Sequence, residues 1–126
     1  MLEKGKKATV STVVSEKNTA KTVGSGCLDV FSTPMMIALM EQAACECMAD
    51  SLEIGQTSVG TLINVEHVCA SPVGAEITAA ATIESIDGKK ISFSVSARMG
   101  ETIIGHGTHS RVIINAERFM EKLNEI

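Results

Sequence analysis

The hydrophobic period of the chain changes from helical to alternating near Gly55, and this change limits the folds open to it. Before it, apolar side chains recur at a helical period from residue 33 to about 51 or 52, on most of the helix circumference. After it, four stretches alternate as half-buried strands do, at residues 57–69, 76–86, 90–98 and 102–114. An earlier strand is expected at residues 8–14, which are rich in Val and Thr. This order predicts an α+β fold in which an antiparallel sheet wraps around one long central helix.

Local signals agree with these elements. Thr33 is expected to be the N-cap of the long helix, with Pro34 at its first position. Asp87-Gly88 predicts a hairpin between two of the strands, and residues 115–126 predict a short amphipathic helix or tail.

Length and hydropathy indicate one domain over residues 1–126, without an interdomain linker. No apolar run approaches the roughly 18 residues that span a bilayer, so we expect no membrane partner. The basic start of the chain is followed by a polar-interrupted strand pattern, which is not the apolar stretch of a signal peptide. A cytoplasmic location is therefore predicted.

Charge and aromatic content argue against nucleic acid as a partner. The net charge is -4, from 11 basic and 15 acidic residues, and only three aromatic residues could stack on bases. An anionic ligand would need a local basic cluster or a helix N-terminus. The four cysteines form no CxxC pair, and Cys45 and Cys47 point about 200° apart on a helix. They are interpreted as buried reduced thiols, and no metal site is predicted.

Glu41 is an unusual residue on the long helix. On a helical wheel it lies away from the polar face, and no Lys or Arg stands three or four positions from it. A carboxylate buried without a partner is costly and raises its pKa, and such groups cluster at functional sites. The alternative is that Glu41 lies at the rim of the apolar face, where it reaches water or a backbone amide. The wheel leaves both interpretations open.

Two further polar residues are weak signals when they are taken separately. Thr33 stands eight residues before Glu41, about 12 Å along the helix axis, and is explained by capping. His67 ends a strand, where a histidine is commonly a structural residue.

Four stretches of the sequence, in their order and spacing, resemble the fluoroacetyl-CoA thioesterase-like family of the hot-dog superfamily. The resemblance covers nearly the whole chain and includes a final strand with the pattern G-x-G-T-H-x-R. It implies the hot-dog fold, which agrees with the element order above. The stretches are FSTPMMIALMEQAA, SVGTLINVEHVCASPVG, IDGKKISFSVSAR and IGHGTHSRVII.

The resemblance implies an acyl-CoA thioesterase with a catalytic set of Thr33, Glu41 and His67, in a pocket at a dimer interface. Coenzyme A is then part of the substrate, and no separate cofactor is expected. The exposed edge of an open sheet independently favours pairing with a second copy, so we expect a homodimer or a higher oligomer. The substrate-binding residues that the resemblance implies are Gly60, His106 and Arg111.

The chemistry of thioester hydrolysis suits these side chains. Glu41 could activate water as a base or attack the carbonyl directly, and the Gly60 N–H could bind the thioester oxygen. His67 could orient Glu41 and favour the departing thiolate, while Thr33 could donate a hydrogen bond or accept the acyl group. A small or medium acyl group is expected.

Three other functions stay open from the sequence. A hot-dog enoyl-CoA hydratase would normally need an Asp–His pair, whereas the helix here carries Glu41 with Thr33. A non-catalytic acyl-CoA binding module could keep the pocket without turnover. A purely structural oligomer gives no reason for Glu41 to lie off the polar face.

Overall fold

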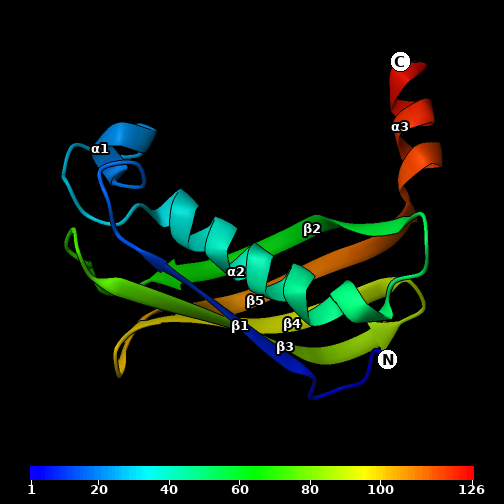
Figure 1. Ribbon diagram of the computed structural model, residues 1–126, viewed down its shortest axis with the longest axis horizontal. Coiled ribbons are helices and arrows are strands. Elements are labelled where there is room, and N and C mark those ends of the chain that lie inside the picture. The colour runs from blue at the N-terminus through cyan, green and yellow to red at the C-terminus, as the bar shows by residue number, and fades with distance from the viewer.

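The computed structural model describes all residues, 1–126, and contains five strands and three α-helices (Figure 1). In chain order they are β1 (Lys7–Val13), α1 (Ala20–Val23), α2 (Thr33–Met48), β2 (Gln56–His67), β3 (Glu76–Asp87), β4 (Lys90–Met99), β5 (Thr102–Asn115) and α3 (Ala116–Asn124). A single 3-10 turn, Ala49–Ser51, extends α2. Each predicted strand is confirmed, with its ends shifted by at most two residues.

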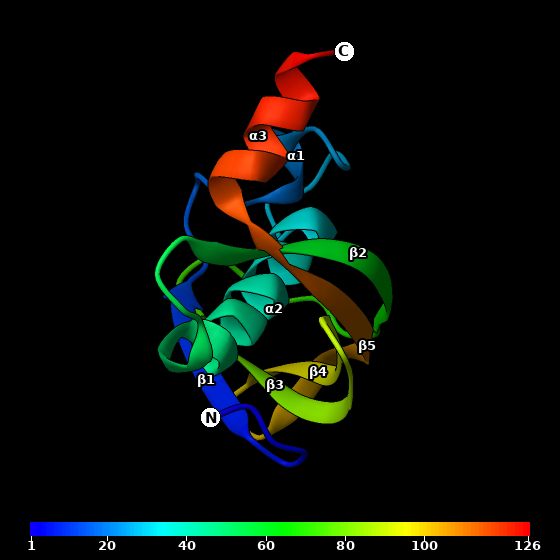
Figure 2. The same ribbon diagram turned by 90° about the vertical axis from the view of Figure 1, so that its right-hand side faces the viewer.

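The strands form one antiparallel sheet in the order β1-β3-β4-β5-β2. The sheet curves around α2, which lies in its concave face (Figures 1 and 2). Seven side chains of α2 are buried there, and they pack in one core with apolar residues of β3, β4 and β5. The predicted α+β fold is therefore confirmed. The order also leaves β1 and β2 as the two edge strands of the sheet.

The start of α2 differs from the prediction. Its N-cap is Ser32, whose buried side chain accepts a hydrogen bond from the backbone N–H of Met35 at 3.3 Å. Thr33 is the first helical residue, so the predicted cap was wrong by one position. Serine and threonine are both favoured N-cap residues, serine the more so, and the sequence Ser32-Thr33-Pro34 contains both. The correction leaves the Thr33 hydroxyl free for another partner.

Three smaller features of the structure can also be compared with the sequence predictions. The four-residue helix α1 was not predicted, because it is too short to show a hydrophobic period. The β3–β4 hairpin turns at Gly88, whose φ of 62° suits a residue without a side chain. The helix α3 projects from one end of the sheet and buries none of its residues (Figure 2).

The cysteines depart from their predicted burial. Cys47 on α2 is buried, but Cys27 and Cys45 are exposed and Cys69 is partly exposed. Cys45 and Cys47 lie on opposite sides of α2, as the helical period requires. All four thiols are free. The structure contains no helix that is both long and apolar enough to cross a membrane.

Candidate active site

The predicted catalytic residues fall into two clusters in the single chain. The first joins the start of α2 to the end of β2, where Thr33 Oγ1 lies 2.8 Å from His67 Nδ1. A cavity of about 210 Å³ opens beside this pair and is lined by apolar residues from the α1–α2 segment, including Phe31. The Thr33 hydroxyl is exposed, so a ligand in the cavity can reach it.

The imidazole of His67 has one ring nitrogen without a partner. Its Nδ1 faces Thr33, while Nε2 is buried and has no hydrogen-bond partner in the protein. Burial lowers the pKa of His67 from its ordinary value, and the backbone of Cys69 opposes this shift. A largely neutral histidine can exchange a proton near neutral pH, which is the property expected of a general acid or base.

The second cluster surrounds Glu41 at the middle of α2. Its carboxylate Oε2 lies 3.4 Å from Nη1 of Arg111, which comes from β5. The Glu41 side chain is 41% exposed, whereas that of Arg111 is only 8% exposed. The rim interpretation of Glu41 is therefore correct, and the expectation of a buried, unpartnered carboxylate was wrong. Arg111 stands 70 positions away in sequence and lies on β5, so the spacing of residues along α2 does not reveal it as the partner of Glu41.

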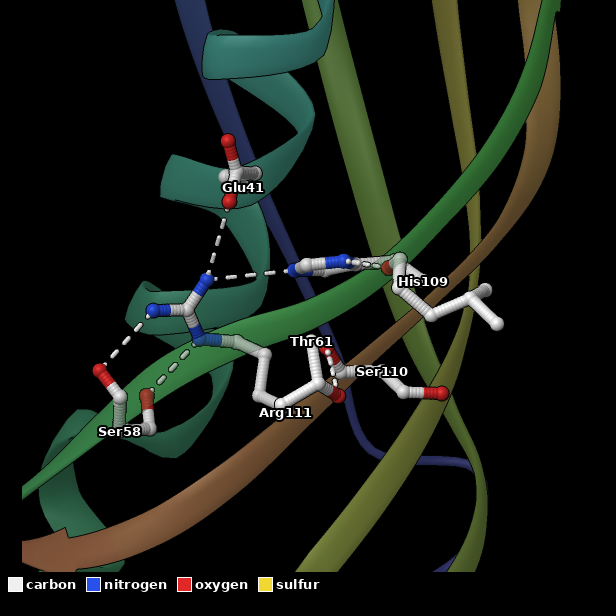
Figure 3. A network of polar contacts seen from close by, with 7 residues as sticks. Glu41, Ser58, Thr61, His109, Ser110 and Arg111 are labelled. Atoms are coloured by element: carbon white, nitrogen blue, oxygen red, sulfur yellow. Dashed lines mark hydrogen bonds and ion pairs between the residues drawn. The ribbon is translucent and has the colours of Figure 1, made fainter.

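Arg111 is fixed on three sides (Figure 3). Its Nε donates to the Ser58 hydroxyl at 2.8 Å, and its Nη2 donates to the Ser58 carbonyl at 3.0 Å. Its Nη1 lies 3.2 Å from Nε2 of His109 as well as facing Glu41. The guanidinium is thus held by β2 and β5 in one orientation, with one edge directed at the carboxylate.

Gly60 on β2 is closely approached by the side chains of this cluster. A Cβ at this position would lie 2.8 Å from Glu41 Oε2, 3.2 Å from His109 Cε1 and 3.3 Å from Arg111 Nη1. Any larger residue would therefore press on Glu41. A cavity of about 210 Å³, lined by Gly60, Glu41 and His109 among others, lies over the same spot. A larger one of about 580 Å³ reaches Glu41 and Arg111 along the exposed side of α2.

The structure does not bring the two clusters together within one chain. Thr33 and Glu41 are eight residues apart on α2, which separates their backbones by about 12 Å. Gly60 and His67 are seven residues apart on the extended strand β2, which separates them by roughly 20 Å. Of the six predicted site residues, Thr33 and His67 meet at one place, and Glu41, Gly60 and Arg111 at another.

His106, the sixth predicted residue, lies apart from both clusters. It is on the outer face of the sheet, where its half-exposed side chain lies 3.9 Å from Glu66. His109 on the same strand faces inward instead and contacts Arg111. His109 was not predicted from the sequence, although the pattern G-x-G-T-H-x-R contains both His109 and Arg111. Residues two apart on a strand share a face, and this spacing could have identified His109.

Comparison with known proteins identifies the family of the chain. Residues 14–117 match the sequence profile of a family described as fluoroacetyl-CoA-specific thioesterases. The fluoroacetyl-CoA thioesterase of Streptantibioticus cattleyicolor is 42% identical over 97 residues, which are 77% of this chain and 70% of that protein.

Solved structures extend the match to the fold. A variant of the fluoroacetyl-CoA-specific thioesterase in complex with fluoroacetate and CoA is 36% identical, with a TM-score of 0.89 over 94% of this chain and 99% of that one. A hypothetical protein of Thermus thermophilus, a thioesterase superfamily member, is 25% identical, with a TM-score of 0.88 over 98% and 93% of the two chains. The predicted hot-dog fold and thioester hydrolase class are confirmed, and the chain belongs to the fluoroacetyl-CoA-specific thioesterase family.

Proposed function

We propose that this protein hydrolyses a small acyl-CoA thioester, with Glu41, Thr33 and His67 as its catalytic residues. The observation that carries the proposal is the Glu41 carboxylate, held by Arg111 beside the uncovered backbone of Gly60. A thioester carbonyl needs open backbone to approach closely, and a glycine provides it. The partly exposed carboxylate is accessible to water, which is the second reactant.

In the proposed reaction Glu41 removes a proton from a water molecule that attacks the carbonyl carbon, or Glu41 attacks that carbon itself and forms an anhydride that water then hydrolyses. The carbonyl oxygen then takes up negative charge, which the Gly60 N–H and the Arg111 guanidinium are suited to stabilise. As the carbon–sulfur bond breaks, the thiolate of coenzyme A leaves, and the Thr33–His67 pair is positioned to supply a proton or a hydrogen bond. These groups all belong to the protein, so the proposal includes no cofactor beyond the coenzyme A of the substrate.

The separation of the two clusters supports a site shared between two copies of the chain. The edge strand β2 has β5 as its only neighbour, and it exposes Leu62 and Ile63 near its centre. Antiparallel pairing of β2 with a second β2, centred on Asn64, would set Gly60 of one chain opposite His67 of the other, because the bulge between Gly60 and Leu62 adds one residue to that side of the strand. We therefore propose a homodimer in which each site takes Glu41 from one chain and the Thr33–His67 pair from the other.

The size of the acyl group follows from the space at Gly60. The cavity there is about 210 Å³ and must also admit the thioester and a water molecule. A short acyl group fits this volume best. Selectivity for a fluorinated acyl group is outside the proposal. The cytoplasmic location stays a prediction from the sequence.

A panel of acyl-CoA thioesters tests the proposal. Short, medium and long saturated esters, together with a short enoyl-CoA, are mixed with the protein and a thiol-reactive dye. We expect dye reaction from released coenzyme A, fastest with the short esters, and its loss in Glu41→Gln, which keeps the size of the side chain but cannot act as a base.

The same panel separates the alternatives. Loss of enoyl absorbance without thiol release would identify a hydratase, and saturable binding without either signal would identify a binding module. Turnover by Glu41→Gln within a few fold of wild type would contradict the proposed mechanism, provided that circular dichroism shows both proteins folded.

A further inference from the structure

His109 is a buried histidine that the mechanism above does not use. It lies on the inner face of β5, is 1% exposed, and its ring stacks on Phe93 of β4 with centroids 6.0 Å apart. Both of its ring nitrogens are occupied: Nδ1 lies 2.7 Å from the Leu62 carbonyl oxygen, and Nε2 lies 3.2 Å from Arg111 Nη1. Packing alone does not require two polar contacts aimed at opposite sides of the ring.

The partners of His109 determine which nitrogen carries the proton. A backbone carbonyl can only accept a hydrogen bond, so Nδ1 must be the donor to Leu62. A guanidinium can only donate, so Nε2 must be the bare acceptor for Arg111. The ring is therefore a neutral imidazole with its proton on Nδ1. Protonation of Nε2 would place a second cation against Arg111 and abolish that hydrogen bond.

The nitrogen of Arg111 that contacts His109 is the same one that faces Glu41. Nη1 reaches Glu41 Oε2 at 3.4 Å, while Nε and Nη2 are tied to Ser58. Without His109, the guanidinium would keep its hydrogen bonds to Ser58, and Nη1 would be left with Glu41 as its only partner. The elements around His109 contribute two other charged groups, Arg111 from β5 and Glu41 from α2.

We infer that His109 is a positioning residue, which holds the Arg111 guanidinium through its bare Nε2 so that Glu41 is kept beside Gly60. The inference rests on the proposed function, because the carboxylate it places is the proposed base. The Leu62 carbonyl fixes the tautomer of the His109 ring. It lies just after the register shift in β2 between Gly60 and Leu62. The strand that provides Gly60 thus also sets the orientation of Arg111.

Two substitutions of His109 test the inference. His109→Phe keeps an aromatic ring against Phe93 but has no acceptor for Arg111, and we expect kcat to fall about 10²-fold with KM changed less than threefold. His109→Gln places an amide oxygen near the position of Nε2, and we expect it to recover at least about tenfold of the lost kcat, as a side chain needed only for packing would not. Thermal unfolding of each variant controls for loss of the fold.

A double-mutant cycle asks whether His109 acts through Arg111. Arg111→Ala alone should lower kcat, and adding His109→Phe to it should cost less than about twofold more, since the group that His109 positions is already gone. Losses that multiply would overturn the inference. Loss of less than threefold in His109→Phe, while Glu41→Gln is inactive, would overturn it without touching the proposed function.

A spectroscopic measurement gives an answer independent of activity. In the wild-type protein, long-range ¹⁵N–¹H correlation spectra at neutral pH should show His109 with its proton on Nδ1 and a bare Nε2. A proton on Nε2, or a ring that exchanges between tautomers, would overturn the inference even if the variants are too unstable to assay.

Discussion

Thr33 Oγ1 and His67 Nδ1 lie 2.8 Å apart, although 34 positions separate these residues in the chain. The contact exists because Ser32, and not Thr33, caps α2 and satisfies the backbone N–H of Met35. A threonine engaged in capping would direct its hydroxyl toward the helix backbone. The shift of the cap by one residue therefore releases the Thr33 hydroxyl for His67.

Because Ser32 caps α2 and Thr33 contacts His67, substitutions of these two adjacent residues should have different effects. Ser32→Ala removes the cap and should lower the free energy of unfolding by about 1 kcal/mol. Thr33→Ala removes an exposed hydroxyl and should change it by less than about 0.5 kcal/mol, while kcat falls about 10²-fold. Thr33→Ser keeps the hydroxyl and is the matched control. Urea unfolding and steady-state kinetics separate the two effects, and a stability loss centred on Thr33→Ala would contradict the assignment.

The same pair of residues shows how much of the structure could be predicted from the sequence. The hydrophobic period predicted every strand and the central helix, because an element that is buried on one face has apolar residues at a regular spacing along the chain. The cap was predicted one residue too late, since Ser32 and Thr33 are both favoured N-cap residues. Arg111 as the partner of Glu41 depends on pairing between distant strands, which no local pattern encodes. His109 was within reach, because it is two residues from Arg111 in an alternating strand.

Gly60→Ala should lower activity more than stability. The added Cβ would lie 2.8 Å from Glu41 Oε2, and the end of a flexible side chain can move away where backbone could not. We expect Glu41 to be displaced and kcat to fall about 10²-fold. Gly88→Ala is the control: it has open space but a φ of 62°, so it should cost about 1 kcal/mol of stability and leave kcat unchanged. Equal kcat for both variants would contradict the role of Gly60.

Acid should destabilise the protein through His109. Burial lowers the pKa of His109, the hydrogen bond to Leu62 opposes this, and Arg111 lowers it further, whereas the unfolded chain has a value near 6.5. Below pH 6.5 the unfolded chain binds more protons at this site, so the free energy of unfolding falls as pH falls. The slope from one histidine is at most about 1.4 kcal/mol per pH unit.

Urea unfolding between pH 7.5 and 5 measures this slope. The pKa of His67 is also lowered by burial and adds to the wild-type slope in the same direction. His109→Gln has no imidazole at the site, so the difference between the two proteins isolates His109. Parallel curves for wild type and His109→Gln would show that His109 ionises equally in both states and would contradict its neutral form.

The proposed shared site makes a prediction about mixed dimers. Glu41→Gln and His67→Ala should each be inactive alone, for different reasons. In a dimer with one chain of each kind, a site that takes Glu41 from one chain and His67 from the other can still be complete. One of the two sites then has both wild-type residues, and the other has neither.

Random exchange of subunits therefore gives a quantitative outcome. Equal amounts of the two variants should form about half mixed dimers, each with one active site of two, and so recover about a quarter of wild-type activity. Sites confined to single chains would stay inactive in every combination, because each chain carries one lesion. Exchange is verified by native mass spectrometry of the mixture. Mixed dimers without activity would contradict the shared site, and a monomeric wild type in the same spectrum would contradict the dimer itself.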